Sequence, residues 1–216
     1  MAILVREPKV HWNYFLALES DVVRLARFIE FRKDNFSTYS IEIARLIMAA
    51  AAEVDVVAKL VCKKLAPESR PQNINGYASV ILQAANPKLP DLTILIPRYG
   101  LTLKPWISWT PETPPLWWTA YNKVKHHRDT GFKEATLGNA LNAVSALFSL
   151  TIYHYALQIQ YHPMRPGGTV RKRENALASD PGRKLVLSRL QPQAQLFQLR
   201  TQLGDIAEYL GDRDVQ

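Results

Sequence analysis

The chain has 216 residues, and its 27 lysines and arginines against 19 acidic residues give a formal net charge of +8. Hydrophobic residues make up 47% of the chain, as in an ordinary globular protein. The single cysteine, Cys62, excludes a disulfide framework and a cysteine-rich zinc site. No stretch has the roughly 18 uninterrupted apolar residues of a membrane span, and the first residues lack a signal-peptide core. We therefore expect a soluble, cytoplasmic protein.

Helical periodicity dominates the first 65 residues. Apolar side chains recur every three or four positions over residues 11–31, which predicts a helix with one buried face. A turn follows, in which Ser37 or Thr38 is expected to cap a second, long helix over residues 38–65. Pro67 ends that helix.

Prolines crowd the next segment, residues 67–115, and predict an irregular insertion. Within it, Asn75-Gly76 is typical of a turn, and residues 77–85 fit a short helix. Residues 93–96 and 101–103 flank Pro97-Arg98-Tyr99-Gly100, which favours a small β-hairpin or two extended segments.

Two further helices are expected, over residues 116–128 and 134–161. The first begins after Pro114-Pro115 and is broken by Gly131, and the second is stopped by Pro163. Beyond it, residues 184–190 could be extended and residues 196–210 are weakly helical. The predicted fold is therefore all-α: one helical bundle domain over residues 1–162, with the insertion at about 67–115. Residues 163–216 form a basic loop and C-terminal extension expected to pack on the same domain.

The densest polar cluster lies in residues 117–128. On a helix, residues four apart share a face, so Trp118, Asn122 and His126 are expected to stack on one side. Amide, imidazole, ammonium and aromatic groups together can hold a phosphodiester and transfer a proton near neutral pH. The alternative is that the tryptophans are core residues while Asn122 and His126 bond to buried backbone groups.

An all-helical domain with a long second helix and a late Asn-x3-His motif resembles the HEPN superfamily (higher eukaryotes and prokaryotes nucleotide-binding). Many members carry an Arg-x4-6-His motif, and members with an intact motif are commonly metal-independent endoribonucleases that pair their motifs across a dimer interface. The resemblance implies an RNA-binding protein of a bacterial toxin–antitoxin or defence system. It also implies RNA as a partner, together with a protein antitoxin, a nucleotidyltransferase or a second copy of the chain.

The resemblance is specific only over residues 121–128, where Asn122-Lys123-Val124-Lys125-His126 matches the polar-x3-His part. Tyr121 stands where the motif has arginine, and a phenol cannot contact phosphate as a guanidinium does. The resemblance implies His126 or His127 as acid and base and Asn122 as a positioning group. The cations that it implies for phosphate are Lys123, Lys125 and Arg128.

Glu53, at the edge of the apolar face of the second helix, is a candidate supporting residue. Its carboxylate could meet Lys125, His126 or Arg128 and orient an imidazole, with Trp118 and Tyr121 also beside the site. A purely structural role for Glu53 stays open.

The remaining polar residues carry weaker signals. His11, His154 and His162 are scattered without metal-ligand spacing, and no nucleotide-binding glycine loop is present, so neither metal nor cofactor is expected. His154 is expected to be a core or boundary histidine and Cys62 a small hydrophobe. The run Arg171-Lys172-Arg173 is a generic phosphate-contact site, or else a solvated loop.

The basic surplus has two locations. Residues 117–133 carry four lysines and arginines against one acidic residue, and residues 163–189 carry seven against two. This favours RNA binding, with metal-independent cleavage as the activity implied by the resemblance. Two alternatives remain: a non-catalytic protein-interaction or dimerisation module, and a nucleotide-binding accessory protein of a nucleotidyltransferase.

Overall fold

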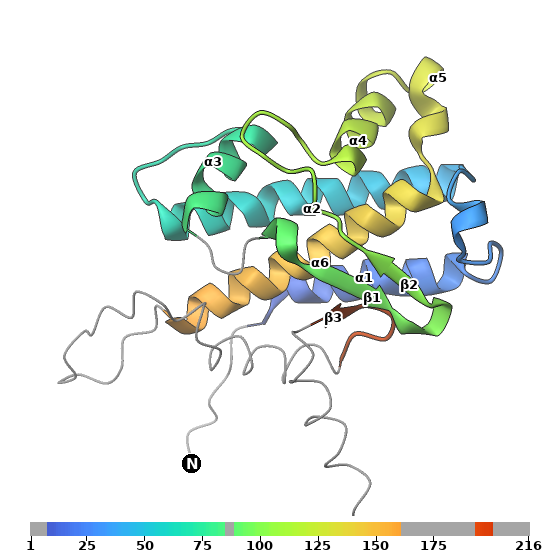
Figure 1. Cartoon of the computed structure of the whole chain (residues 1–216), viewed down its shortest axis with the longest axis horizontal. Helices are drawn as coiled ribbons and strands as arrows, with labels where there is room; N and C mark the ends of the chain where they lie inside the picture. Colours follow the sequence, from blue (N-terminus) through green and yellow to red (C-terminus); the bar gives the residue numbers. More distant parts are fainter. Residues whose placement is uncertain (1–7, 85–88, 161–192, 201–216) are drawn as a thin grey trace, which may run out of the picture.

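A computed structural model describes residues 8–84, 89–160 and 193–200 (Figure 1). The described chain is mostly helical and carries a small antiparallel sheet, so the predicted largely helical fold is confirmed. The helices are α1 (Val10–Leu25), α2 (Ile41–Leu65), α3 (Ile74–Ala84), α4 (Leu116–His126), α5 (Arg128–Gly131) and α6 (Leu137–Gln160). The strands are β1 (Thr93–Ile96), β2 (Leu101–Leu103) and β3 (Gln198–Arg200).

Helix α6 is the centre of the bundle and packs against α1, α2 and α4 (Figure 1). Its segment Leu137–Leu157 is long and apolar enough to cross a membrane, but 94% of its most apolar window is buried inside the structure. That is the packing of a core helix.

The long second helix is confirmed as α2, with a different cap from the predicted one. The Ser40 hydroxyl accepts a hydrogen bond from the Ile43 N–H at 3.2 Å, so Ser40 caps the helix and neither Ser37 nor Thr38 does. The Thr38 carbonyl instead accepts from the Leu137 N–H, which joins this turn to the start of α6.

Helix α1 ends at Leu25, earlier than the periodicity predicts. The chain turns there because Phe31 is buried against the hairpin, with its ring centroid 4.9 Å from that of Tyr99. Tertiary packing of one aromatic residue thus overrides the local helical pattern.

The predicted hairpin is confirmed as β1 and β2, which pair antiparallel with Ile94 opposite Leu103. Gly100, at φ +61°, provides the left-handed residue that returns the chain into β2. On the other edge of β1 lies β3, with Ile94 opposite Leu199. Residues 198–200 are therefore a strand rather than part of the predicted weak helix, because the open edge of β1 supplies their backbone partners.

The segment leading into β3 is fixed to α1 by a buried carboxylate. Glu19 is only 2% exposed, and it accepts the backbone N–H groups of Gln195, Leu196 and Phe197 at 2.9, 2.8 and 3.2 Å. The Trp12 indole N–H donates to the Gln193 side chain at 3.0 Å. Residues 193–200 therefore pack on the helical bundle.

Buried tryptophans order the insertion. The indole N–H of Trp106 donates to Ser149 on α6 at 2.9 Å, and that of Trp109 donates to the Ile74 carbonyl at 3.1 Å. Helix α3 begins at Ile74, so Asn75-Gly76 lies in its first turn and not in a separate turn. The Asn73 side chain accepts from the Gly76 N–H at 2.8 Å and holds that first turn.

Candidate functional site

Helix α4 has a buried aromatic face and an exposed polar face. The buried side chains are Trp117, Trp118, Tyr121 and Val124. Among the exposed polar side chains at and after its C-terminal end are Asn122, Lys123, Lys125, His126, His127 and Arg128, and together these six are called the α4 polar surface below; the exposed Asp129 follows them. Trp118 lies at the buried edge of the side of α4 that it was expected to share with Asn122 and His126, while those two side chains are exposed.

The alternative for Asn122 and His126 is wrong. Both side chains face solvent, and neither has a hydrogen-bond partner in the described part of the chain. The tryptophans are core residues, as that alternative had it, and Trp117 donates its indole N–H to the Pro105 carbonyl at 2.8 Å.

The cations of the α4 polar surface differ in their partners. Lys123 Nζ lies 3.1 Å from Glu134 Oε1, and Lys125 Nζ lies 5.4 Å from the centroid of the Tyr121 ring. Arg128 forms no ion pair with any described residue. A Cβ at Gly131 would lie 2.8 Å from the Lys123 carbonyl oxygen, so glycine there permits the close turn that carries Arg128.

Tyr121 occupies the position that the HEPN motif fills with arginine. It is 7% exposed, and its ring centroid lies 5.1 Å from that of Trp118. This position points into the aromatic core, so it offers no direct phosphate contact. The buried rings of Tyr121 and Trp118 anchor α4 in the core beneath the α4 polar surface.

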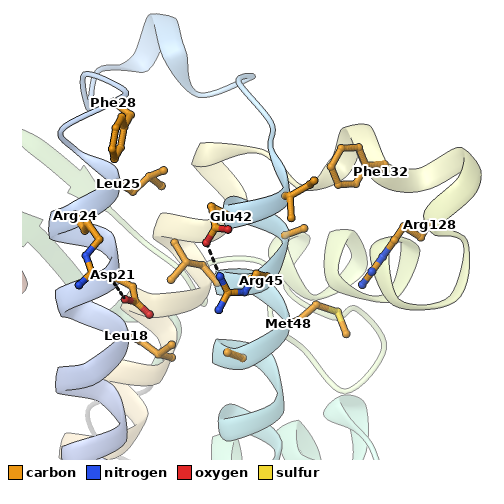
Figure 2. Close-up of a pocket in the computed structure, with 14 residues that line it drawn as sticks. Leu18, Asp21, Arg24, Leu25, Phe28, Glu42, Arg45, Met48, Arg128 and Phe132 are labelled. Carbon is orange, nitrogen blue, oxygen red and sulfur yellow. Dashed lines mark hydrogen bonds and ion pairs between the residues drawn. The ribbon is translucent and has the colours of Figure 1, made fainter.

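An open groove of about 850 Å³ crosses the first turns of α2, between the end of α1 on one side and α5 on the other (Figure 2). Each of these elements contributes one arginine to its lining: Arg24 from α1, Arg45 from α2 and Arg128 from α5. Arg128 therefore belongs both to the groove and to the α4 polar surface.

The expected partnership of Glu53 with α4 is wrong. Glu53 Oε1 lies 2.6 Å from His11 Nδ1, and both side chains are about 15% exposed. Arg128 instead lines the groove with Met48, nearer the start of α2. Antiparallel packing of α1 on α2 brings the beginning of α1 to Glu53 and leaves the α4 polar surface beside earlier turns of α2.

A second polar cluster surrounds Glu53, formed by His11, His154 and Tyr155. The rings of His11 and His154 meet edge to face, with their centroids 5.5 Å apart. Burial first, and then the nearby His11 and Lys64, together lower the pKa of His154 to about 4, so the imidazole is neutral at pH 7. Burial raises the pKa of Tyr155.

No sequence pattern indicated this cluster. His11 and Glu53 lie 42 residues apart, on different helices, and His154 lies on a third. Only the packing of α1, α2 and α6 brings them together. His154 is 8% exposed, in line with the boundary position expected for it.

The other chemistry-bearing residues have plain structural roles. Burial raises the pKa of the Cys62 thiol to about 12, so it acts as a small core hydrophobe. In the described ranges, no group of three or more His, Cys, Asp or Glu side chains could hold a metal ion. Arg171, Lys172 and Arg173, expected to contact phosphate, lie outside the described residues.

Comparison with known proteins yields no relative from which a function can be transferred. No protein-family model matches the chain, and neither a curated protein nor a solved structure matches it significantly. The interpretation of the α4 polar surface therefore rests on the chemistry and geometry of its own residues.

Proposed function

We propose that this protein binds RNA through the α4 polar surface and that His126 serves there in metal-independent cleavage of the RNA backbone. The observation that carries the proposal is the uninterrupted exposure of residues 125–128, two cations and two imidazoles, at the end of a helix whose other face is fixed in the core.

Phosphate binding follows from the charges of this surface. Lysine and arginine gain free energy when they displace the counterions condensed on a nucleic acid. Lys125 and Arg128 form no ion pair in the described part of the chain, so neither must break one to contact phosphate.

Cleavage requires a group that can accept a proton and return it, and imidazole is the side chain that most often does this in enzymes. In the proposed step, His126 accepts the proton of a ribose 2′-hydroxyl, whose oxygen attacks the adjacent phosphorus. The bond from phosphorus to the 5′-oxygen breaks, leaving a 2′,3′-cyclic phosphate, and His127 protonates the departing 5′-oxygen. Asn122 positions the phosphodiester, and Lys125 and Arg128 stabilise its charge.

The resemblance to HEPN domains supports the same proposal. The long α2, the helical bundle and the polar-x3-His spacing of Asn122 and His126 resemble that family's pattern, but His126 ends α4, whereas the family's motif lies near the start of a helix. A second copy of the chain at this surface and a toxin–antitoxin or defence role belong to the proposal through the resemblance alone. A cytoplasmic location belongs to it as the expectation drawn from the sequence.

The test incubates the purified full chain with 5′-labelled RNA in EDTA, beside His126→Ala and Thr119→Ala. Thr119 is exposed on α4 outside the α4 polar surface, which makes it the matched control. Cleavage that survives chelation, persists in Thr119→Ala and disappears in His126→Ala supports catalysis. Salt-sensitive RNA retention without cleavage in any of the three proteins leaves binding and overturns catalysis. Absence of retention overturns both.

A non-catalytic interaction module is the second candidate, and the burial of Tyr121 at the motif arginine position favours it. Ile107 and Leu116, 63% and 73% exposed beside the start of α4, offer apolar contacts to a protein partner. Sedimentation equilibrium of the wild type and of Leu116→Asp tests this alternative. A dimer that dissociates on substitution, in a protein without RNA retention, supports the module over the RNA-binding proposal.

A further inference from the structure

The groove across α2 has the composition of a site for single-stranded nucleic acid. Phe28, at the end of α1, is 80% exposed, and Ile41, at the start of α2, is 69% exposed. Figure 2 shows Phe28 and Arg24 on one wall and Arg128 and Phe132 on the opposite wall, with Arg45 between them. Aromatic and apolar surface thus alternates with guanidinium groups along one open groove.

The charged side chains of the groove indicate an anionic occupant. Arg24 pairs with Asp21 at 3.8 Å and Arg45 pairs with Glu42 at 2.7 Å, and both arginine side chains are more than 70% exposed. Exposed ion pairs of this kind contribute little to stability, so a phosphate can compete for either guanidinium. Arg128 has no ion pair in the described part of the chain, so the groove carries one uncompensated positive charge.

Phe28 offers an aromatic ring for base stacking, which a site that binds only phosphate does not need. A phenyl ring so exposed gains nothing from the core of this molecule, yet it offers a flat surface on which a base can stack. Phe132, on the other wall, already has an edge-to-face neighbour in Tyr39, with centroids 5.7 Å apart. Base stacking is therefore assigned to Phe28, and phosphate contact to the arginines.

We infer that the groove between α1, α2 and α5 is the binding track for a short stretch of single-stranded RNA, with a base on Phe28 and the backbone passing Arg45 toward Arg128. This inference rests on the proposed function, because Arg128 would deliver the strand to the α4 polar surface. It adds the specificity of the site: unpaired strands enter, whereas a duplex keeps its bases away from Phe28.

The experiment measures fluorescence anisotropy of the full chain with a labelled oligouridine of about 12 nucleotides. The same backbone made of abasic residues serves as a second probe. The variants are Phe28→Ala, Arg128→Ala and Lys125→Ala, with Arg70→Ala and Ile107→Ala as exposed controls outside the groove. Thermal melts verify that each variant is folded. We expect all of them to fold, because each substitution changes an exposed side chain.

Phe28→Ala is expected to weaken oligouridine binding about tenfold, as loss of one stacked base does, and to leave the abasic probe unchanged. Arg128→Ala is expected to weaken both probes and to reduce the salt dependence by about 0.7 in log–log slope. The two controls should bind as the wild type does.

The results distinguish failure of the groove inference from failure of the proposed function. If Lys125→Ala weakens RNA binding and Phe28→Ala does not, the groove is not the track, while the proposed function stands. If the wild type binds neither probe, both proposals fail. If Phe28→Ala dissociates a wild-type dimer and leaves RNA affinity unchanged, the groove is a protein interface and the inference is overturned.

Discussion

His11 Nδ1 lies 2.6 Å from Glu53 Oε1, and this contact ties the first turn of α1 to the middle of α2. Both side chains are largely withdrawn from solvent, so the interaction is screened less than a surface pair. It also holds the His11 ring edge-on to His154, on α6. This hydrogen bond and this ring contact thereby connect three helices of the bundle.

Removal of the Glu53 carboxylate should destabilise the fold. Glu53→Ala and His11→Ala should each lower the free energy of unfolding, and a double-mutant cycle should return a coupling of about 1–2 kcal/mol at pH 7. Urea unfolding followed by circular dichroism measures all four proteins. The exposed pair Glu42–Arg45, taken through the same cycle, should give about 0.5 kcal/mol or less. Equal couplings for the two pairs would contradict the special role of His11–Glu53.

Acid should destabilise the protein through His154. Its pKa is about 4 in the folded chain and 6.5 by its ordinary value, because burial and the charges of His11 and Lys64 disfavour the imidazolium. As pH falls from 6.5 to 4, the unfolded state therefore binds a proton that the folded state does not. Over that window the free energy of unfolding should fall by about 3 kcal/mol. The Tyr155 ring also contacts the His154 ring, with centroids 5.1 Å apart.

The measurement for this prediction compares urea unfolding at pH 7 and pH 5 for the wild type, His154→Gln and His127→Gln. His154→Gln should lose less stability between the two pH values than the wild type loses. His127 is exposed, so His127→Gln should keep the wild-type profile. A parallel profile for His154→Gln would show that the acid sensitivity arises elsewhere.

Glu19 should decide whether residues 193–200 stay on the bundle. Glu19→Ala removes an acceptor shared by three backbone N–H groups. The free energy that holds residues 193–200 on the bundle should therefore fall by about 3 kcal/mol. Hydrogen exchange should show faster exchange at the amides of residues 195–197, with α6 protected as before. Asp21→Ala, an exposed carboxylate two residues along α1, should leave exchange at residues 195–197 unchanged.

Restoring the motif arginine should not create an active site. Tyr121→Arg would place a guanidinium against Trp118 in the core, so we expect a loss of about 2–4 kcal/mol in unfolding free energy and no gain in RNA cleavage. Tyr121→Phe retains the ring and should remain within about 1 kcal/mol of the wild type. Faster cleavage by a stably folded Tyr121→Arg protein would overturn the assignment of this position to the core.

The sequence by itself determined the long helices α2 and α6 and the hairpin of β1 and β2, because their signals lie within short stretches of the chain. The apolar repeat of α2 and α6 spans many turns, and the hairpin is framed by Pro97 and Gly100, so period and turn chemistry sufficed. The exposure of the polar residues among 122–128 depended on which face of α4 the core would take. One side of α4 is buried and consists of Trp117, Trp118, Tyr121 and Val124. The polar residues lie on the other, exposed side.

Tertiary structure alone decided the pairings across the chain. Glu53 meets His11 because α1 packs antiparallel on α2, and β3 forms because β1 has an open edge beside the Glu19 carboxylate. Arg24, Arg45 and Arg128 share a groove although no local pattern relates them. Such contacts depend on the relative placement of whole helices, which periodicity along the chain does not encode, and both the groove and the cluster around Glu53 arise from that placement.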